Sequence, residues 1–163
     1  MGTAYRHTGV VALAQGDLPA AKDDLQKSLD LFNELGARWD IGRSLIYLGK
    51  VELAEGDSYE ARRIFLETLP MAMEVRAIPI ALDVFAELAQ LEAMGDNWYQ
   101  AFKLSQFILR QTASTPEAKA QAGRLSAEVE EHLTEKKIRD ARNWTETNSM
   151  EEIVEALLME GIK

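Results

Sequence analysis

Arg43, Tyr47 and Lys50 are the side chains in this sequence with the strongest claim to binding chemistry. Their spacing of four and then three residues places them on one face of a helix. A guanidinium and an ammonium that flank a phenol ring make an amphipathic surface, which suits a peptide or a partner helix. These residue types therefore predict recognition of a protein segment, without bond making or bond breaking.

No other pattern predicts catalysis, a metal site or a bound cofactor. The sequence has no glycine-rich phosphate loop that ends in Gly-Lys-Ser/Thr, no GxSxG elbow and no HExxH pair. It has no cysteine, and its two histidines, His7 and His132, lie far apart without a second ligand at helical spacing. Paired acids such as those at 130–131 fall on expected helix faces, where solvent or the helix dipole accounts for them. We expect a protein that is not an enzyme.

The composition is that of a folded, acidic protein of 163 residues. Its net charge of −9 argues against nucleic acid as a partner, because phosphate contacts need clustered Lys and Arg. No apolar run approaches the roughly 18 residues that span a bilayer, and the N-terminus lacks the apolar block of a secretory signal. We expect a cytoplasmic protein without membrane contact, whose acidity serves solubility or, alternatively, a basic partner.

The elements that position these side chains recur at an interval of forty residues. The first two copies share one register, which pairs Gly9 with Gly49, Val11 with Val51, Leu13 with Leu53, Gly16-Asp17 with Gly56-Asp57, Ala21 with Ala61, Leu25 with Phe65 and Leu29 with Leu69. A third copy continues with Leu88, Ala89 and Leu91, but its turn, Gly95-Asp96, comes one residue early. A single insertion or deletion would break the register, so chance does not explain it.

Apolar spacing divides each copy into two helices. The second helices carry the stripes Leu18, Ala21, Leu25, Leu29, Phe32 and Leu35 in copy one, and Ala61, Ile64, Phe65, Thr68, Ala72 and Val75 in copy two. We expect the glycine of each turn to end the first helix and the following aspartate (Asp17, Asp57, Asp96) to cap the next. Glu60 is expected to complete a capping box with Asp57. Pro70, inside a second helix, predicts a kink or a break.

These residues resemble the signature of the tetratricopeptide repeat family. Copy two supplies Leu45, Leu48-Gly49, Ala61, Phe65 and Thr68, and copy one supplies Tyr5, Gly9, Ala12, Ala21, Leu25 and Ser28. Glu52 departs from this signature, because an apolar residue is expected there. The resemblance implies an all-α fold, a right-handed α-α superhelix (solenoid) of about three helical hairpins in residues 1–112. The hairpins span about 2–37, 38–76 and 77–112, and capping helices follow in 113–163.

The resemblance also implies that the first helix of each hairpin lines a concave groove for a protein partner. The groove positions are Thr3, His7 and Val10 in copy one, Arg43, Tyr47 and Lys50 in copy two, and Asp83, Glu87 and Gln90 in copy three. The acids of copy three argue against capture of a partner's terminal carboxylate. The alternative is that Arg43 and Asp83 lie on adjacent helices and pair, which would contribute about 0–1 kcal/mol and imply no ligand.

The tail is similar to the C-terminal end of large bacterial signalling and transcriptional regulators. That resemblance rests on a helix over 116–133, a shorter helix over 135–144 that ends at Trp144, and a last helix opened by a capping box of Ser149 and Glu152. It implies the sensor or interaction part of a regulator. The alternative is a domain that senses a small molecule in the groove. Tyr5, Val11 and Leu13 additionally suggest a homodimer through an apolar surface at the open N-terminal end.

Overall fold

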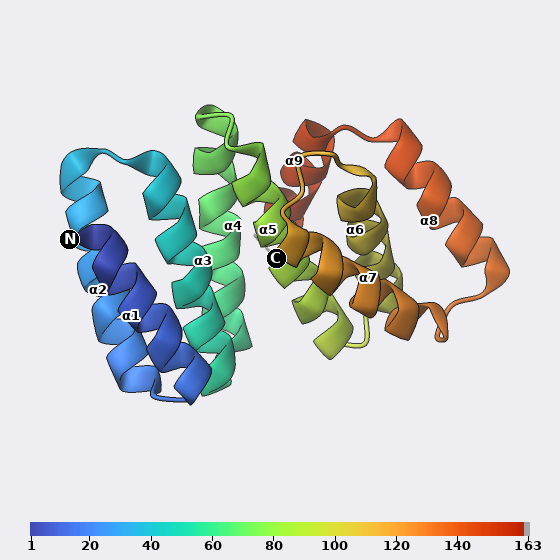
Figure 1. Cartoon of the computed structure of the whole chain (residues 1–163). Coiled ribbons are helices and arrows are strands. Elements are labelled where there is room, and N and C mark those ends of the chain that lie inside the picture. Colours follow the sequence, from blue (N-terminus) through green and yellow to red (C-terminus); the bar gives the residue numbers. More distant parts are fainter. Residues whose placement is uncertain (162–163) are drawn as a thin grey trace. The chain divides into compact units, whose positions relative to one another are not determined.

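The structure, a computed structural model, describes residues 1–161 of the chain. These residues form nine α-helices and no strand (Figure 1). The helices are α1 (Gly2–Gln15), α2 (Leu18–Leu35), α3 (Arg38–Glu55), α4 (Ser58–Glu74), α5 (Ile78–Met94), α6 (Trp98–Arg110), α7 (Pro116–Glu130), α8 (Glu135–Thr147) and α9 (Met150–Glu160). The expected all-α architecture of helical hairpins is confirmed. None of these helices is both long and apolar enough to cross a membrane.

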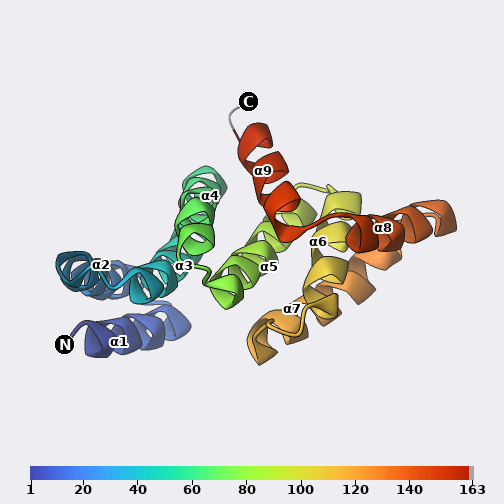
Figure 2. The ribbon, with the colours of Figure 1, turned by 90° about the horizontal axis from the view of Figure 1, so that it is seen from above.

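The chain divides into two compact units. The N-terminal unit is Met1–Ile80 and holds α1 to α4, whereas the C-terminal unit begins at Ala81, close to the start of α5. In the N-terminal unit, α1 with α2 and α3 with α4 form two hairpins, and α3 also packs against α2 and touches α1 (Figures 1 and 2). The core cluster shared by the two hairpins is Ala21, Leu25, Leu48, Val51 and Ile64. The second hairpin therefore stacks on the first, in agreement with the repeat.

Gly49 lets α3 and α4 approach closely. A Cβ atom built on Gly49 would lie 2.3 Å from Cε1 of Phe65, which is fully buried on α4. No side chain fits at that distance, so the glycine creates the space that the ring fills. Ala61, one turn before Phe65, is also fully buried. Small residues therefore lie where these two helices meet.

Left-handed glycines reverse the chain inside both N-terminal hairpins. Gly16 has a φ of 79° and Gly56 has a φ of 89°, a conformation that glycine adopts without steric strain. Asp17 and Asp57 then cap the next helices, since each carboxylate accepts a hydrogen bond from the backbone N–H three residues on, at 3.2 and 2.9 Å. These turns are formed as expected.

In the third turn α5 ends directly before Gly95, as expected, but the expected left-handed conformation of Gly95 and the expected cap by Asp96 are wrong. The left-handed residue is Asp96, with a φ of 60°, and the N-cap of α6 is Asn97, whose side chain makes no capping hydrogen bond. Asn97 instead donates from Nδ2 to Oε2 of Glu92, at 2.7 Å. The backbone keeps the forty-residue interval. The left-handed position therefore falls on Asp96, one residue after the glycine, and the N-cap position falls on Asn97, one residue after the aspartate.

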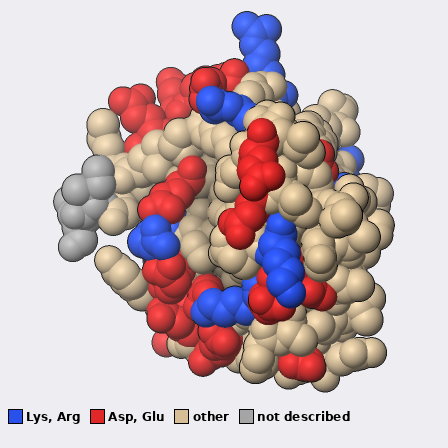
Figure 3. All heavy atoms as spheres, turned by 90° about the vertical axis from the view of Figure 1, so that its left-hand side faces the viewer, with Lys and Arg blue, Asp and Glu red and all other residues tan. Residues whose placement is uncertain are grey.

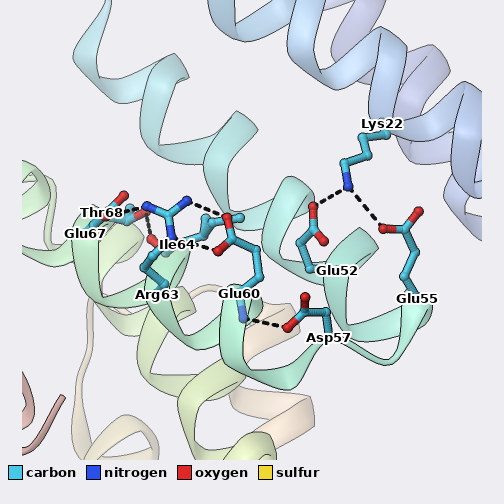
Figure 4. Close-up of polar contacts among 9 residues, drawn as sticks. All are labelled: Lys22, Glu52, Glu55, Asp57, Glu60, Arg63, Ile64, Glu67 and Thr68. Carbon is cyan, nitrogen blue, oxygen red and sulfur yellow. Dashed lines mark hydrogen bonds and ion pairs between the residues drawn. The ribbon is translucent and has the colours of Figure 1, made fainter. Parts of the chain in front are cut away.

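The expected capping box at Asp57 is not formed. Asp57 does accept from the Glu60 N–H, but the Glu60 carboxylate bonds Arg63, whose Nε lies 2.7 Å from Glu60 Oε2 (Figure 4). Arg63 also donates to Glu67. A guanidinium that forms a forked hydrogen bond along one helix face competes successfully with a single backbone N–H.

Pro70 does not break α4, so the expectation of a break is wrong. The helix is continuous from Ser58 to Glu74 with Pro70 inside it. Pro70 is exposed, so its ring does not displace a packed neighbour, and the helix continues although the proline removes one backbone hydrogen bond. A kink within the continuous helix stays a prediction.

The last residue of each expected apolar stripe is not buried. Leu35 is 75% exposed and Val75 is 40% exposed. Both lie where the second helix ends, and α3 and α5 then begin within three residues. Each stripe therefore extends to the C-terminal end of its helix, beyond the residues that are buried.

In the C-terminal unit α6 packs against α7 and α8. Phe85 of α5 meets Phe107 of α6 edge to face, with ring centroids 5.9 Å apart. Helix α7 ends at Glu130, earlier than the expected position 133, and α8 continues to Thr147, beyond the expected end at Trp144. The other expected helices of this unit are present within the described residues 81–161.

The last helix begins as expected. Ser149 accepts a hydrogen bond from the N–H of Glu152, and the Glu152 carboxylate accepts one from the N–H of Ser149, at 2.7 Å. This capping box is therefore confirmed, and it satisfies backbone donors that the helix itself leaves without a partner.

Candidate functional site

The side chains that could bind a partner in the N-terminal unit form a strip along α1 and α3. We call it the α1–α3 strip, and it consists of Thr3, His7 and Val10 on α1 and Trp39, Arg43, Tyr47 and Lys50 on α3. Helices α1 and α3 touch each other, and equivalent positions of the repeat lie on equivalent faces of the two helices. The strip therefore joins matching faces of the two first helices.

On α3, the aromatic ring of Tyr47 is held by the core. Tyr47 is half-buried and packs against the cluster that contains Leu48 and Val51, and the ammonium of Lys50 lies 5.6 Å from the centre of its ring. Arg43 is exposed and makes no ion pair within the N-terminal unit. The core thus holds the Tyr47 ring in place between Arg43 and Lys50 on one face of α3, and the role of this surface in binding stays a prediction.

Trp39 extends this surface and was missed by the sequence analysis. It lies four residues before Arg43 on α3, hence on the same face, and it is 46% exposed. Its exposed indole adds apolar area next to the half-buried Tyr47 ring on the same face of α3. Its helical spacing from Arg43 and Tyr47 was the signal that could have found it.

Arg6 fixes α1 against α3 at one end of the strip. Its guanidinium is buried, with 4% of the residue exposed, and Nη1 donates to Oδ1 of Asp40 at 2.8 Å. The same guanidinium lies over the Phe32 ring of α2, 5.2 Å from its centre, and Gly2 packs closely against that ring. Three helices are joined by one side chain, directly beside Trp39.

Lys22 of α2 fixes the other end of α3 (Figure 4). Its ammonium lies 2.7 Å from Oε1 of Glu52 and 3.1 Å from Oε2 of Glu55. These hydrogen bonds, first to Glu52 and then to Glu55, raise the pKa of Lys22. Glu52 is buried, so the departure from the family signature is explained by a cation on the neighbouring helix that satisfies the charge.

The α1 part of the strip is polar and accessible. Thr3 and His7 are exposed and Val10 is half-buried. His132, the other histidine, stacks on the ring of Trp98 in the C-terminal unit, with centroids 4.4 Å apart. In residues 1–161 there is no group of three or more His, Asp or Glu side chains placed to hold a metal ion.

The three remaining predicted groove residues belong to the C-terminal unit. Asp83 accepts a hydrogen bond from Oγ1 of Thr115 at 2.6 Å, Glu87 is buried and Gln90 is half-buried. Thr115 is also the cap of α7, so Asp83 helps to position that helix. The structure thus gives Asp83 a local structural role. A pair between Arg43 and Asp83 stays a prediction.

Charged side chains are unevenly distributed on the face that Figure 3 presents. Figure 3 shows that acidic and basic side chains gather together on part of the face that it presents and leave a broad uncharged area. Helix α1 accounts for such an area, because its one arginine, Arg6, is buried and its sequence has no Lys, Asp or Glu.

Comparison with known proteins supports the assignment of the N-terminal hairpins. Residues 1–74, which hold α1 to α4, match the family model described as tetratricopeptide repeat. No curated protein and no solved structure matches the chain. Tetratricopeptide repeats generally mediate protein–protein interaction.

Proposed function

We propose that this chain is a protein-interaction module that binds a partner segment along the α1–α3 strip. The observation that carries the proposal is the row of Trp39, Arg43 and Tyr47 on α3, which the core and the flanking ion pairs hold in place. Trp, Tyr and Arg are the residue types that dominate binding energy at protein interfaces. A surface that is already ordered before binding loses little conformational entropy on association.

The strip favours a partner segment that combines apolar and acidic side chains. Arg43 places positive charge beside exposed aromatic surface, in a chain whose net charge is −9. An apolar side chain would cover the Trp39 and Tyr47 rings, and a carboxylate would be attracted to Arg43. Attraction of this kind raises the association rate and selects the register of the bound segment.

Selection from a displayed library of random peptides tests this proposal. The wild-type chain should select peptides that share apolar and acidic positions. Tyr47→Ala with Arg43→Gln should weaken their binding by about tenfold or more. The matched control is Tyr59→Ala with Arg124→Gln, which removes an exposed tyrosine and an exposed arginine elsewhere and should leave binding unchanged.

Because Tyr47 contacts the core, Arg43→Gln alone serves as a second variant that leaves the packing intact. Selected peptides that bind all variants equally would count against the strip. Tight binding of a metabolite in a thermal-shift screen, together with no peptide selected, would instead favour the small-molecule alternative.

We further propose that the module is the C-terminal interaction part of a larger bacterial regulator. Support comes from the tail, where a helix that carries Trp144 precedes a last helix opened by the Ser149–Glu152 capping box. The proposal is tested by the coding sequence upstream of Met1. An effector domain in the same reading frame would support it, and a stop codon directly upstream would contradict it.

Self-association through α1 is the second part of the proposal. The positions of α1 that point away from α2 are Ala4, Thr8, Val11 and Gln15, and all four are exposed. Their equivalents forty residues on are Ser44, Leu48, Val51 and Glu55, which face α2 in the stacked hairpins; Ser44 bonds Ser28 and Glu55 bonds Lys22. Interface cores are depleted of charge, and this face carries none.

Light scattering at high concentration tests the self-association. A dimer that Val11→Lys converts into a monomer would support an interface at α1, because a lysine cannot be buried there without a partner. The matched control is Leu35→Lys, which changes an exposed apolar residue away from α1. A wild-type chain that remains monomeric would exclude the dimer.

A further inference from the structure

Two lysines and two aromatic rings form a cluster between α6 and α8 of the C-terminal unit. The ammonium of Lys103 lies 4.6 Å from the centre of the Trp144 ring and 5.2 Å from that of Tyr99. The ammonium of Lys137 lies 5.9 Å from the same Tyr99 ring. We call these four residues the Lys–aromatic cluster, and they lie entirely outside the α1–α3 strip.

Lys103 is a half-buried cation that no carboxylate neutralises at close range. Within residues 1–161 it makes no salt bridge. Burial lowers the pKa of Lys103, and the carboxylates of Glu160 and Glu92 offset that shift only in part. An ammonium removed from water is unfavourable without compensation, and the two ring faces supply some of it through cation–π attraction. The positive charge at the centre of the cluster is therefore only partly compensated.

The polar atoms of the cluster are almost all hydrogen-bond donors. The ammoniums of Lys103 and Lys137 and the indole N–H of Trp144 can only donate. Burial and then the charge of Asp140 raise the pKa of Tyr99, so its hydroxyl keeps its proton and can donate as well. Within residues 1–161 none of these four groups donates a hydrogen bond to another side chain or to the backbone. A ligand that complements this surface therefore presents a group that only accepts hydrogen bonds.

We propose that the Lys–aromatic cluster binds a carboxylate side chain of a protein partner, with an adjoining apolar side chain of that partner on the Tyr99 and Trp144 rings. A carboxylate is an acceptor-only group with a negative charge, so it complements an ammonium such as that of Lys103. The inference rests on the proposed function, because it assumes a protein partner. It adds a second contact surface and the chemical character of the segment that fits it.

The probe for this site is an acetylated and amidated pentapeptide with one phenylalanine between two pairs of glutamates. Its titration into the full chain is followed through the indole N–H signals in a ¹⁵N NMR spectrum, with the Trp144 signal assigned from Trp144→Phe. We expect the Trp144 signal to shift and the affinity to fall as salt is added, because salt screens the ion pairs. A matched peptide with glutamine in place of each glutamate should not bind.

The variants separate the cluster from general electrostatics. Lys103→Gln with Lys137→Gln should weaken binding of the glutamate peptide by about tenfold. The matched control, Lys119→Gln with Lys136→Gln, also removes one half-buried and one exposed lysine from the same unit and should change the affinity little.

Arg43→Gln, which weakens the α1–α3 strip, should leave this titration unchanged, so the two sites are tested independently. Equal weakening by the cluster and control variants would overturn the proposal. It would also be overturned if the glutamate peptide did not bind at concentrations up to about 10 mM, or if the glutamine peptide bound as well.

Discussion

Single residues fix the helices of the N-terminal unit at defined points. Gly49 admits the Phe65 ring between α3 and α4, Arg6 joins α1 to α3 beside Trp39, and Lys22 joins α2 to the far end of α3. The contact at Gly49 depends on the small size of glycine, and the contacts of Arg6 and Lys22 depend on their positive charge. The result is that the exposed aromatic side chains of the strip project from a rigid backbone.

The first prediction concerns Gly49. Gly49→Ala should lower the free energy of unfolding by about 1–3 kcal/mol, because the new methyl group would overlap a buried ring. Gly123→Ala is the matched control: that glycine lies inside α7 with open space around it, and alanine should raise stability by about 0.5–1 kcal/mol. Urea unfolding measures both, and changes of the same sign would contradict the packing described for α3 and α4.

The second prediction concerns Glu152 and pH. Hydrogen bonds from the backbone and then the hydroxyl of Ser149 lower the pKa of Glu152 from its ordinary value of 4.5. A carboxyl whose pKa is lowered by folding stabilises the fold above its unfolded pKa, and that contribution is lost as the pH falls through the folded pKa. Glu152→Gln should therefore destabilise α9 at neutral pH but not in strong acid.

Amide hydrogen exchange at about pH 7 measures how far Glu152→Gln destabilises α9 at neutral pH. Unfolding at about pH 3 measures whether the substitution still destabilises the protein in acid. Glu151→Gln provides the control, because Glu151 lies in the same first turn without the capping bond. If both substitutions changed α9 equally, the helix dipole alone would explain the effect and the capping box would not be needed.

For the helices, the forty-residue repeat predicts the positions of α1 to α4 and of the turns between them. Apolar spacing and the Gly-Asp turns place α1 to α4 because local preference and packing agree in both copies. They disagree at Asp96, where the backbone keeps the forty-residue interval although the residues that suit the turn come one position early. Glu60 shows a second limit, because its competing partner Arg63 becomes visible only when side-chain geometry is known.

The third prediction concerns Pro70, which lies inside α4, and the substitution Pro70→Ala. The substitution should raise the free energy of unfolding by about 1–3 kcal/mol, because it restores a backbone hydrogen bond inside α4 and removes the clash of the ring with the preceding turn. The midpoint of urea unfolding measures the change. Pro79→Ala, near the start of α5, is the control and should have a smaller effect, since a helix leaves its first N–H groups without partners. Equal effects would indicate that Pro70 lies at a helix end.

At the scale of the whole molecule, the candidate sites were predicted only in part. His7, Arg43, Tyr47 and Lys50 follow from the repeat, whereas Trp39 follows only from its helical spacing of four residues before Arg43. The Lys–aromatic cluster was not predicted at all. Its members come from α6 and α8, and only tertiary packing brings these helices together.

Binding along the α1–α3 strip can be located by an NMR footprint of a library-selected peptide on the full chain. The account predicts that the largest backbone shifts fall on α1 and α3, around His7, Trp39, Arg43 and Tyr47, and that Arg43→Gln reduces them together with the affinity. Shifts confined to α2 and α4, with α1 and α3 unchanged, would contradict the assignment of binding to the α1–α3 strip.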